Sequence, residues 1–152
     1  MRIVDFLSAE DILSDLRSGE KLGALGELAD LIGQRHALNP KSVFSVLLER
    51  ERLASTGIGE GVAIPHGKLS GAPGLCAVLG RSAEGIPFDS VDGGAAHIFF
   101  ALIAPENSAG LHLKALARIS RLLKDGELRR RLISAGDMSE MYHVLGQEDA
   151  KY

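Results

Sequence analysis

Apolar residues recur at helical spacing in two segments near the start of the chain. The first segment predicts a helix over about residues 19–36, with Ser18 as its cap and with a stripe made of Leu22, Leu25, Leu28, Leu31 and Ile32. The second predicted helix opens at Asn39-Pro40, an N-cap followed by proline at the first helical position, and runs to about Arg52. Residues 1–16 precede them as an entry segment with a short strand or turn.

Three apolar runs in the middle of the chain, at residues 62–64, 75–79 and 95–103, predict strands. None of them alternates strictly between apolar and polar residues, which indicates strands that helices cover on both faces. Residues 70–74 and 80–94 are rich in Gly, Pro, Ser and Asp and predict turns.

Helical spacing returns in the last third of the chain. We predict a helix from about Ser108 to Lys124, ended by Asp125-Gly126, a short helix over 127–135, and a last helix opened by a capping box at 137–140. The order of elements predicts an α/β fold in α/β/α layers, with a mixed central sheet of about four to five strands sandwiched between helices. One domain spans residues 1–152, with residues 1–6 and 147–152 expected to be frayed.

Composition narrows the classes of partner and location. The chain has 152 residues, a net charge of −3 and interspersed acids and bases, so we expect no nucleic-acid partner. The first residues lack a signal peptide's apolar region and no run is long enough to span a bilayer, so we expect no membrane insertion and a cytoplasmic location. The single cysteine, Cys76, lies in an apolar run and is interpreted as an inert buried thiol.

Residues 55–69, Ser-Thr-Gly-Ile-Gly-Glu-Gly-Val-Ala-Ile-Pro-His-Gly-Lys-Leu, carry the most informative chemistry. Their glycine spacing does not match a dinucleotide fingerprint or a P-loop. Glycines permit successive backbone N–H groups to point into one concavity, where they can bind an anion. Further anion-binding groups are the hydroxyls of Ser55 and Thr56 and an arginine at 50 or 52. Next to His66, such a loop indicates a phosphohistidine. The alternative at this point is a tight turn that needs glycine for its geometry alone.

His112 is the second candidate histidine. It shares a helical stripe with Leu116, Ile119 and Leu123 and lies near a predicted helix start, where a neutral imidazole can donate to a phosphoryl oxygen. The alternative is a core histidine bonded to a backbone carbonyl. No pair of His or Cys residues has zinc-ligand spacing, and we expect neither a metal nor a cofactor.

The run from Arg50 to Gly67 resembles the active-site signature of enzyme IIA domains of the fructose and mannitol type, in the bacterial phosphoenolpyruvate-dependent phosphotransferase system. The form Ser-Thr-Gly-Ile-Gly, with Gly-Lys-Leu after the histidine, is most similar to the nitrogen-regulatory enzyme IIA. Further similar stretches are Ile86-Pro-Phe-Asp89 with Asp92-Gly, Ile98 to Pro105, and His112 to Leu122.

The resemblance implies roles for these residues. His66 would carry the phosphoryl group on Nε2, and His112 would contact the phosphoryl oxygens. Arg50 and Thr56 would complete the catalytic set, and the expected phosphoryl cradle consists of Ser55, Gly57, Gly59 and Gly61. The implied donor is a histidine-containing phosphocarrier protein, general or nitrogen-branch, and the implied role is phosphotransfer in nitrogen regulation, through targets such as kinases or transporters.

Two other functions remain open. A sugar-specific enzyme IIA would pass its phosphate to a fructose or mannitol permease IIB domain, and the lack of a fused permease or phosphocarrier segment favours regulation over this reading. A binding module of the same fold would regulate by docking without phosphorylation. Exposed apolar surface near the cleft would allow a homodimer.

Overall fold

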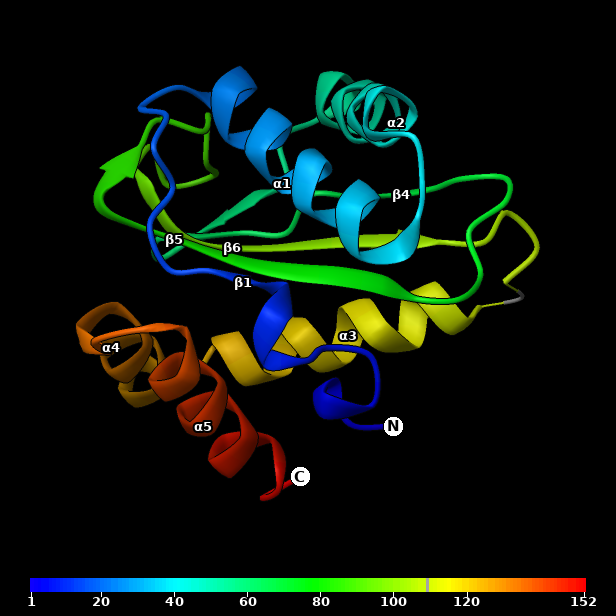
Figure 1. Ribbon diagram of the computed structural model, residues 1–152. Helices are drawn as coiled ribbons and strands as arrows, with labels where there is room; N and C mark the ends of the chain where they lie inside the picture. Colours follow the sequence, from blue (N-terminus) through cyan, green and yellow to red (C-terminus); the bar gives the residue numbers. More distant parts are fainter. Residues whose placement is uncertain (109) are drawn as a thin grey trace.

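A mixed sheet lies between two layers of helices in the computed structural model, which describes residues 1–108 and 110–152 (Figure 1). One layer consists of α1 (Lys21–His36) and α2 (Pro40–Leu53). The other consists of α3 (Leu111–Leu123), α4 (Gly126–Ser134) and α5 (Met138–Asp149). The predicted α/β/α layering is therefore confirmed.

The sheet contains β1 (Ile12–Leu13), β2 (Gly57–Gly59), β3 (Val62–Ala63), β4 (His66–Lys68), β5 (Cys76–Ile86) and β6 (Ala96–Ala104). Its order is β1-β5-β6-β3-β2, and β4 also pairs with β6. β3 and β4 run parallel to β6 one after the other, since Val62 lies opposite Ile98 and His66 lies opposite Leu102. The long strand β6 therefore fixes where His66 lies.

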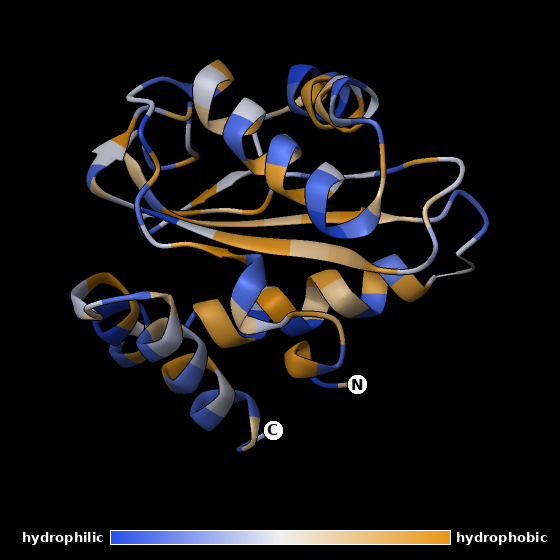
Figure 2. Cartoon of the chain, in the orientation of Figure 1, coloured by the Kyte–Doolittle hydropathy of each residue, from blue (hydrophilic) through white to orange (hydrophobic). Residues whose placement is uncertain are grey.

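The core explains why the central strands lack a polar face. Alternate residues of β6 contribute to two apolar clusters, with Phe100 on the side of α3–α5 and Phe99 on the side of α1 and α2. Figure 2 shows the apolar colour concentrated on β5, β6 and the inward surfaces of the helices. A strand covered on both faces needs apolar side chains in both directions, as the sequence indicated.

The predicted turn over residues 80–94 was wrong in its first half, because β5 continues to Ile86. The polar residue Arg81 is buried inside this strand, and its guanidinium donates to the carbonyl oxygens of Ser14 at 2.9 Å and Leu132 at 3.0 Å. These acceptors come from distant parts of the sequence, so the apolar pattern did not reveal the strand's full length.

Helix boundaries mostly follow their capping residues. Asn39 accepts from the Lys41 N–H and Asp137 from the Glu140 N–H, as predicted. Ser18 was wrong as the first cap, since the N-cap is Glu20. The predicted helix from Ser108 begins at Leu111, and residue 109 within that prediction lies outside the described residues.

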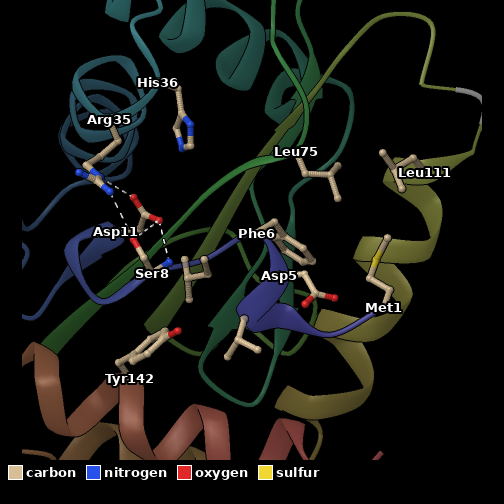
Figure 3. Close-up of a pocket in the computed structure, with 12 residues that line it drawn as sticks. Met1, Asp5, Phe6, Ser8, Asp11, Arg35, His36, Leu75, Leu111 and Tyr142 are labelled. Carbon is tan, nitrogen blue, oxygen red and sulfur yellow. Dashed lines mark hydrogen bonds and ion pairs between the residues drawn. The ribbon is translucent and has the colours of Figure 1, made fainter.

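The expected fraying at both ends was also wrong for several residues. At the N-terminus, Ile3 is fully buried in a short 3-10 turn, Ile3–Asp5. The next turn is tied to α1, because Asp11 accepts from the Arg35 Nε at 2.8 Å and from the Ser8 N–H at 2.8 Å (Figure 3). At the other end, α5 continues through residues 147–149.

Candidate functional site

A groove of about 430 Å³ opens beside β4, between the C-terminal end of α2 and the N-terminal end of α3. β4 contributes His66, Gly67 and Lys68. The helices contribute the remaining lining residues: Val46, Glu49, Arg50, Leu53, His112, Leu113 and Leu116. The structure therefore brings three of the four predicted catalytic residues, Arg50, His66 and His112, to one groove.

His66 is half-buried and its ring has a defined orientation. Its Nδ1 lies 2.7 Å from the carbonyl oxygen of Ile64. Because a carbonyl only accepts, Nδ1 carries the proton, and the neutral ring has its lone pair on Nε2. The predicted carbonyl partner of Nδ1–H is therefore confirmed, and Nε2 has no hydrogen-bond partner among the described residues.

The environment of His66 favours its neutral form. Burial lowers its pKa below 6.5, and the charges of Arg50 and His112 lower it further, whereas the hydrogen bond to Ile64 and the charge of Glu51 raise it. An imidazole whose Nε2 is unprotonated at neutral pH is a nucleophile.

The residues on either side of His66 bring α2 close to it. Pro65 is buried, and its carbonyl oxygen accepts from the Leu102 N–H at 2.9 Å, so the chain stays paired with β6 where it enters β4. A Cβ at Gly67 would collide with Cγ1 of Val46. Glycine at this position therefore permits the close packing of α2 on β4 that carries Arg50 to the groove.

Groups that favour an anion come to the groove from three elements. Arg50 lies in the last turn of α2, and its Nη1 donates to the carbonyl oxygen of Ala54 at 2.9 Å. His112 lies in the first turn of α3, with Nδ1 3.2 Å from the Ser108 hydroxyl. Burial first and the Lys68 charge second lower the pKa of His112. Two cations and a helix N-terminus around one nucleophile favour an anionic ligand.

Thr56, the fourth predicted catalytic residue, does not line the groove. It is buried, its hydroxyl and its N–H both donate to the carboxylate of Glu51, and the N–H distance is 3.0 Å. The hydroxyl proton is thus already committed to a carboxylate. Thr56 belongs to a buried network behind Arg50.

The residues expected to form a phosphoryl cradle lie elsewhere. The Ser55 hydroxyl donates to the Phe88 carbonyl oxygen at 2.7 Å, and Gly57 packs against Ser90. Gly59 and Gly61 have φ angles of 96° and 78° in the β2–β3 turn, which lies at the Ile98 end of β6. Because His66 pairs four residues further along β6, this turn is about 13 Å from it at 3.3 Å per residue. The positive φ angles of Gly59 and Gly61 fit the tight turn that the sequence left open as the alternative.

Lys68 also lines the groove with an exposed side chain, and the sequence analysis assigned it no role. The available signal was its position two residues after His66, because residues i and i+2 of a strand share a face. The other histidines do not line the groove: His97 Nδ1 contacts the Ser82 carbonyl oxygen at 3.0 Å, and His143 is exposed on α5.

Within residues 1–108 and 110–152, no cluster of three or more His, Cys, Asp or Glu side chains is arranged to hold a metal ion. In the same residues, no helix is both long enough and apolar enough to cross a bilayer.

The fold and the groove together define an α/β protein with a half-buried, neutral histidine in a groove that Arg50 and Lys68 also line. The family model for the phosphoenolpyruvate-dependent sugar phosphotransferase system, EIIA 2, matches residues 5–148, and the chain belongs to this family. The resemblance seen in the sequence is therefore confirmed.

Relatives of this family differ in name and in length. A nitrogen regulatory protein of Bradyrhizobium diazoefficiens is 42% identical over 145 residues, which is 95% of each chain. The fructose-specific EIIABC component of Bacillus subtilis is 34% identical over 150 residues, 98% of this chain and 24% of that protein. The match thus includes a relative of similar length and a segment of a much longer one.

The solved structures agree on the fold. Nitrogen regulatory protein IIA-Ntr from Neisseria meningitidis superimposes with a TM-score of 0.88 at 32% identity, covering 94% of this chain and 98% of that one. IIA mannitol from Escherichia coli gives a TM-score of 0.78 at 24% identity, covering 91% of this chain and 98% of that one.

Proposed function

We propose that this protein accepts a phosphoryl group on Nε2 of His66 from a histidine-containing phosphocarrier protein and acts as a regulator in the nitrogen-related branch of the phosphotransferase system. One observation carries the proposal: Nδ1–H of His66 is fixed on the Ile64 carbonyl, which leaves the Nε2 lone pair available beside Arg50 and His112. The similarity to nitrogen regulatory proteins supports the regulatory part.

In the proposed transfer, Nε2 attacks the phosphorus of the donor's phosphohistidine in line. The new N–P bond forms on His66 as the N–P bond on the donor breaks, and the donor imidazole leaves with the bonding electron pair. The transition state is loose, so the protein contributes positioning and charge stabilisation. As the His66 ring gains positive character, its Nδ1–H bond to the Ile64 carbonyl strengthens.

In this transfer Arg50, Lys68 and His112 would stabilise the negative charge on the transferred phosphoryl oxygens. Because these groups come from α2, β4 and α3, a phosphoryl group on His66 would lie at the meeting point of three elements. The exposed apolar residues Leu53 and Leu113 line the same groove and offer the donor a contact surface. The transfer itself needs no cofactor.

Phosphotransfer from the phosphorylated carrier protein tests the proposal directly. His66→Ala should take up no acid-labile phosphate, because the nucleophile is gone. His112→Ala should be labelled more slowly and still to completion, while His143→Ala, which changes an exposed histidine on α5, should match the wild type. Full labelling of His66→Ala would contradict the proposal.

A sugar-specific enzyme IIA is the second candidate, favoured by the 34% identity to the fructose-specific component of Bacillus subtilis. The two functions differ in the acceptor that follows His66. A regulator should pass little phosphate to a purified fructose or mannitol IIB domain, whereas a transport component should discharge rapidly onto it. Complete and rapid discharge would replace the regulatory reading with the transport one.

The third function, docking without phosphorylation, predicts that the wild type itself remains unlabelled.

To find regulatory partners, wild type, His66→Ala and His66→Glu can serve as baits for kinases and transporters. A partner that binds wild type and His66→Ala but not His66→Glu would depend on the unphosphorylated surface. Adding a phosphate introduces roughly −1.5 to −2 charge by analogy with phosphoserine, enough to change that surface.

A further inference from the structure

A buried carboxylate, Glu51, lies directly behind the groove and is not used in the transfer proposed above. Its side chain is 3% exposed. It accepts from the Lys21 Nζ at 2.7 Å and from the Thr56 N–H at 3.0 Å, and it also accepts from the Thr56 hydroxyl. A buried charge that is this fully bonded fixes the groups around it, because breaking any one contact leaves a desolvated charge.

The partners of Glu51 join segments that are far apart in the sequence. Lys21 comes from the start of α1, and its Nζ also contacts Asp89 at 3.0 Å and lies 4.7 Å from the centroid of the Phe88 ring. The carbonyl oxygen of Phe88 accepts from the Ser55 hydroxyl. The stretch from Ile86 to Asp89, to which the sequence gave no chemical role, thus holds the chain between α2 and β2.

This held chain in turn accepts a hydrogen bond from a groove residue. Arg50 precedes Glu51 in α2, and its guanidinium donates to the carbonyl oxygen of Ala54. Ala54 lies in the sequence between Glu51 and Thr56, and the hydrogen bonds of the Glu51 carboxylate join these two residues. If the carboxylate released Thr56, the Ala54 carbonyl would be free to move, and Arg50 would lose the fixed acceptor that sets its guanidinium.

We propose that Glu51 is a positioning residue for phosphotransfer: through Lys21 and Thr56 it fixes the α2–β2 turn and thereby the guanidinium of Arg50 beside His66. This inference rests on the proposed phosphotransfer at His66. Burial alone would raise the pKa of Glu51, but the hydrogen bonds from Lys21 and Thr56 outweigh burial and lower it, so the carboxylate that holds the turn is ionised at neutral pH.

The test is a double-mutant cycle between Glu51→Gln and Arg50→Ala, with the rate of phosphotransfer from the phosphorylated carrier protein as the readout. Glu51→Gln keeps the side-chain shape, and Lys21 keeps Asp89 as a partner. A displacement of about 1 Å in a catalytic group can cost 10²-fold, so we expect a fall of about 10- to 100-fold in kcat with a smaller change in KM. In the Arg50→Ala background, the same substitution should cause little further slowing.

Two further variants separate positioning from loss of stability. Asp11→Asn weakens an ion pair away from the groove, Asp11–Arg35, whose carboxylate side chain is 5% exposed, and it should leave the transfer rate unchanged even if the melting temperature falls. Thr56→Ser keeps both donors to Glu51 and should transfer like the wild type, whereas Thr56→Val loses the hydroxyl and should be slow. The threonine pair decides the matter if Glu51→Gln does not fold.

The result that overturns the inference is a Glu51→Gln protein that transfers at the wild-type rate, or one slowed by the same factor with and without Arg50. Equal rates for Thr56→Val and Thr56→Ser would overturn it too. These outcomes are distinct from failure of the proposed function, because that failure would appear as a wild-type protein that takes up no phosphate.

Discussion

Removing the carboxylate of Asp149 should destabilise the protein far more than its place near the end of the chain indicates. Asp149 is 1% exposed and accepts from Nε and Nη2 of Arg118 at 3.0 and 2.6 Å. It also accepts from the Val4 N–H at 3.2 Å. One side chain thus joins the end of α5 to α3 and to the N-terminal turn.

The magnitude follows from what Asp149→Ala leaves behind. The Arg118 side chain is 13% exposed, so water cannot fully replace its lost partner. Removing one partner of a buried ion pair costs about 3–5 kcal/mol. For a chain of this size each kcal/mol lowers Tm by about 2–4 °C, so we expect a fall of roughly 6–20 °C.

Thermal and urea unfolding of three variants would measure this. Glu127→Ala disrupts an ion pair with Arg130 whose side chains are 65% and 72% exposed, and it should cost no more than about 1 kcal/mol. The double variant Arg118→Met/Asp149→Leu should recover most of the loss, because apolar residues can replace a buried pair. If Asp149→Ala costs no more than Glu127→Ala, the reasoning is refuted and the original expectation of a frayed end is restored.

Two further predictions concern His66 and the β2–β3 turn. Because burial lowers the pKa of His66 below 6.5, most His66 rings are still neutral at pH 6.5, and the rate of phosphate uptake should fall to half its maximum only below that pH. An NMR titration midpoint at or above 6.5 would contradict this. Gly57→Ala would place Cβ 2.5 Å from Oγ and 3.0 Å from Cα of Ser90, and it should cost about 1–3 kcal/mol in urea unfolding. Gly74→Ala, where a new Cβ meets nothing within 4 Å, is its control, and equal stabilities of the two variants would refute the clash.

The sequence predicted the layers of the fold well because local signals agree with the tertiary structure. The start of α2 depends on two adjacent residues, the N-cap Asn39 and Pro40 at the first helical position. The apolar runs of β5 and β6 have helices on both faces. It underestimated the length of β5, because Arg81, Ser82 and Glu84 interrupt the apolar run. The burial of Arg81 depends on carbonyl oxygens from Ser14 and Leu132, which no local pattern can reveal.

The candidate site was predicted unevenly, for a related reason. Proximity in sequence placed the glycines at 57, 59 and 61 with His66, yet β3 runs between them along β6 and separates them from it. Proximity in space depends on packing instead, because Gly67 lets α2 approach β4 and so brings Arg50 to the groove that His112 of α3 also lines.

This arrangement changes which groups would balance the charge of a phosphoryl group on His66. A loop of backbone amides would offer partial charges at fixed positions, whereas Arg50 and Lys68 offer full charges on long side chains that must be held in place. Full charges next to a desolvated anion interact more strongly than dipoles, but they contribute only if their conformational freedom is already restricted. The buried network of Glu51, Thr56 and Lys21 restricts the turn that Arg50 contacts. These residues would therefore fix the position of the Arg50 guanidinium, as the backbone itself fixes the amide groups of a loop.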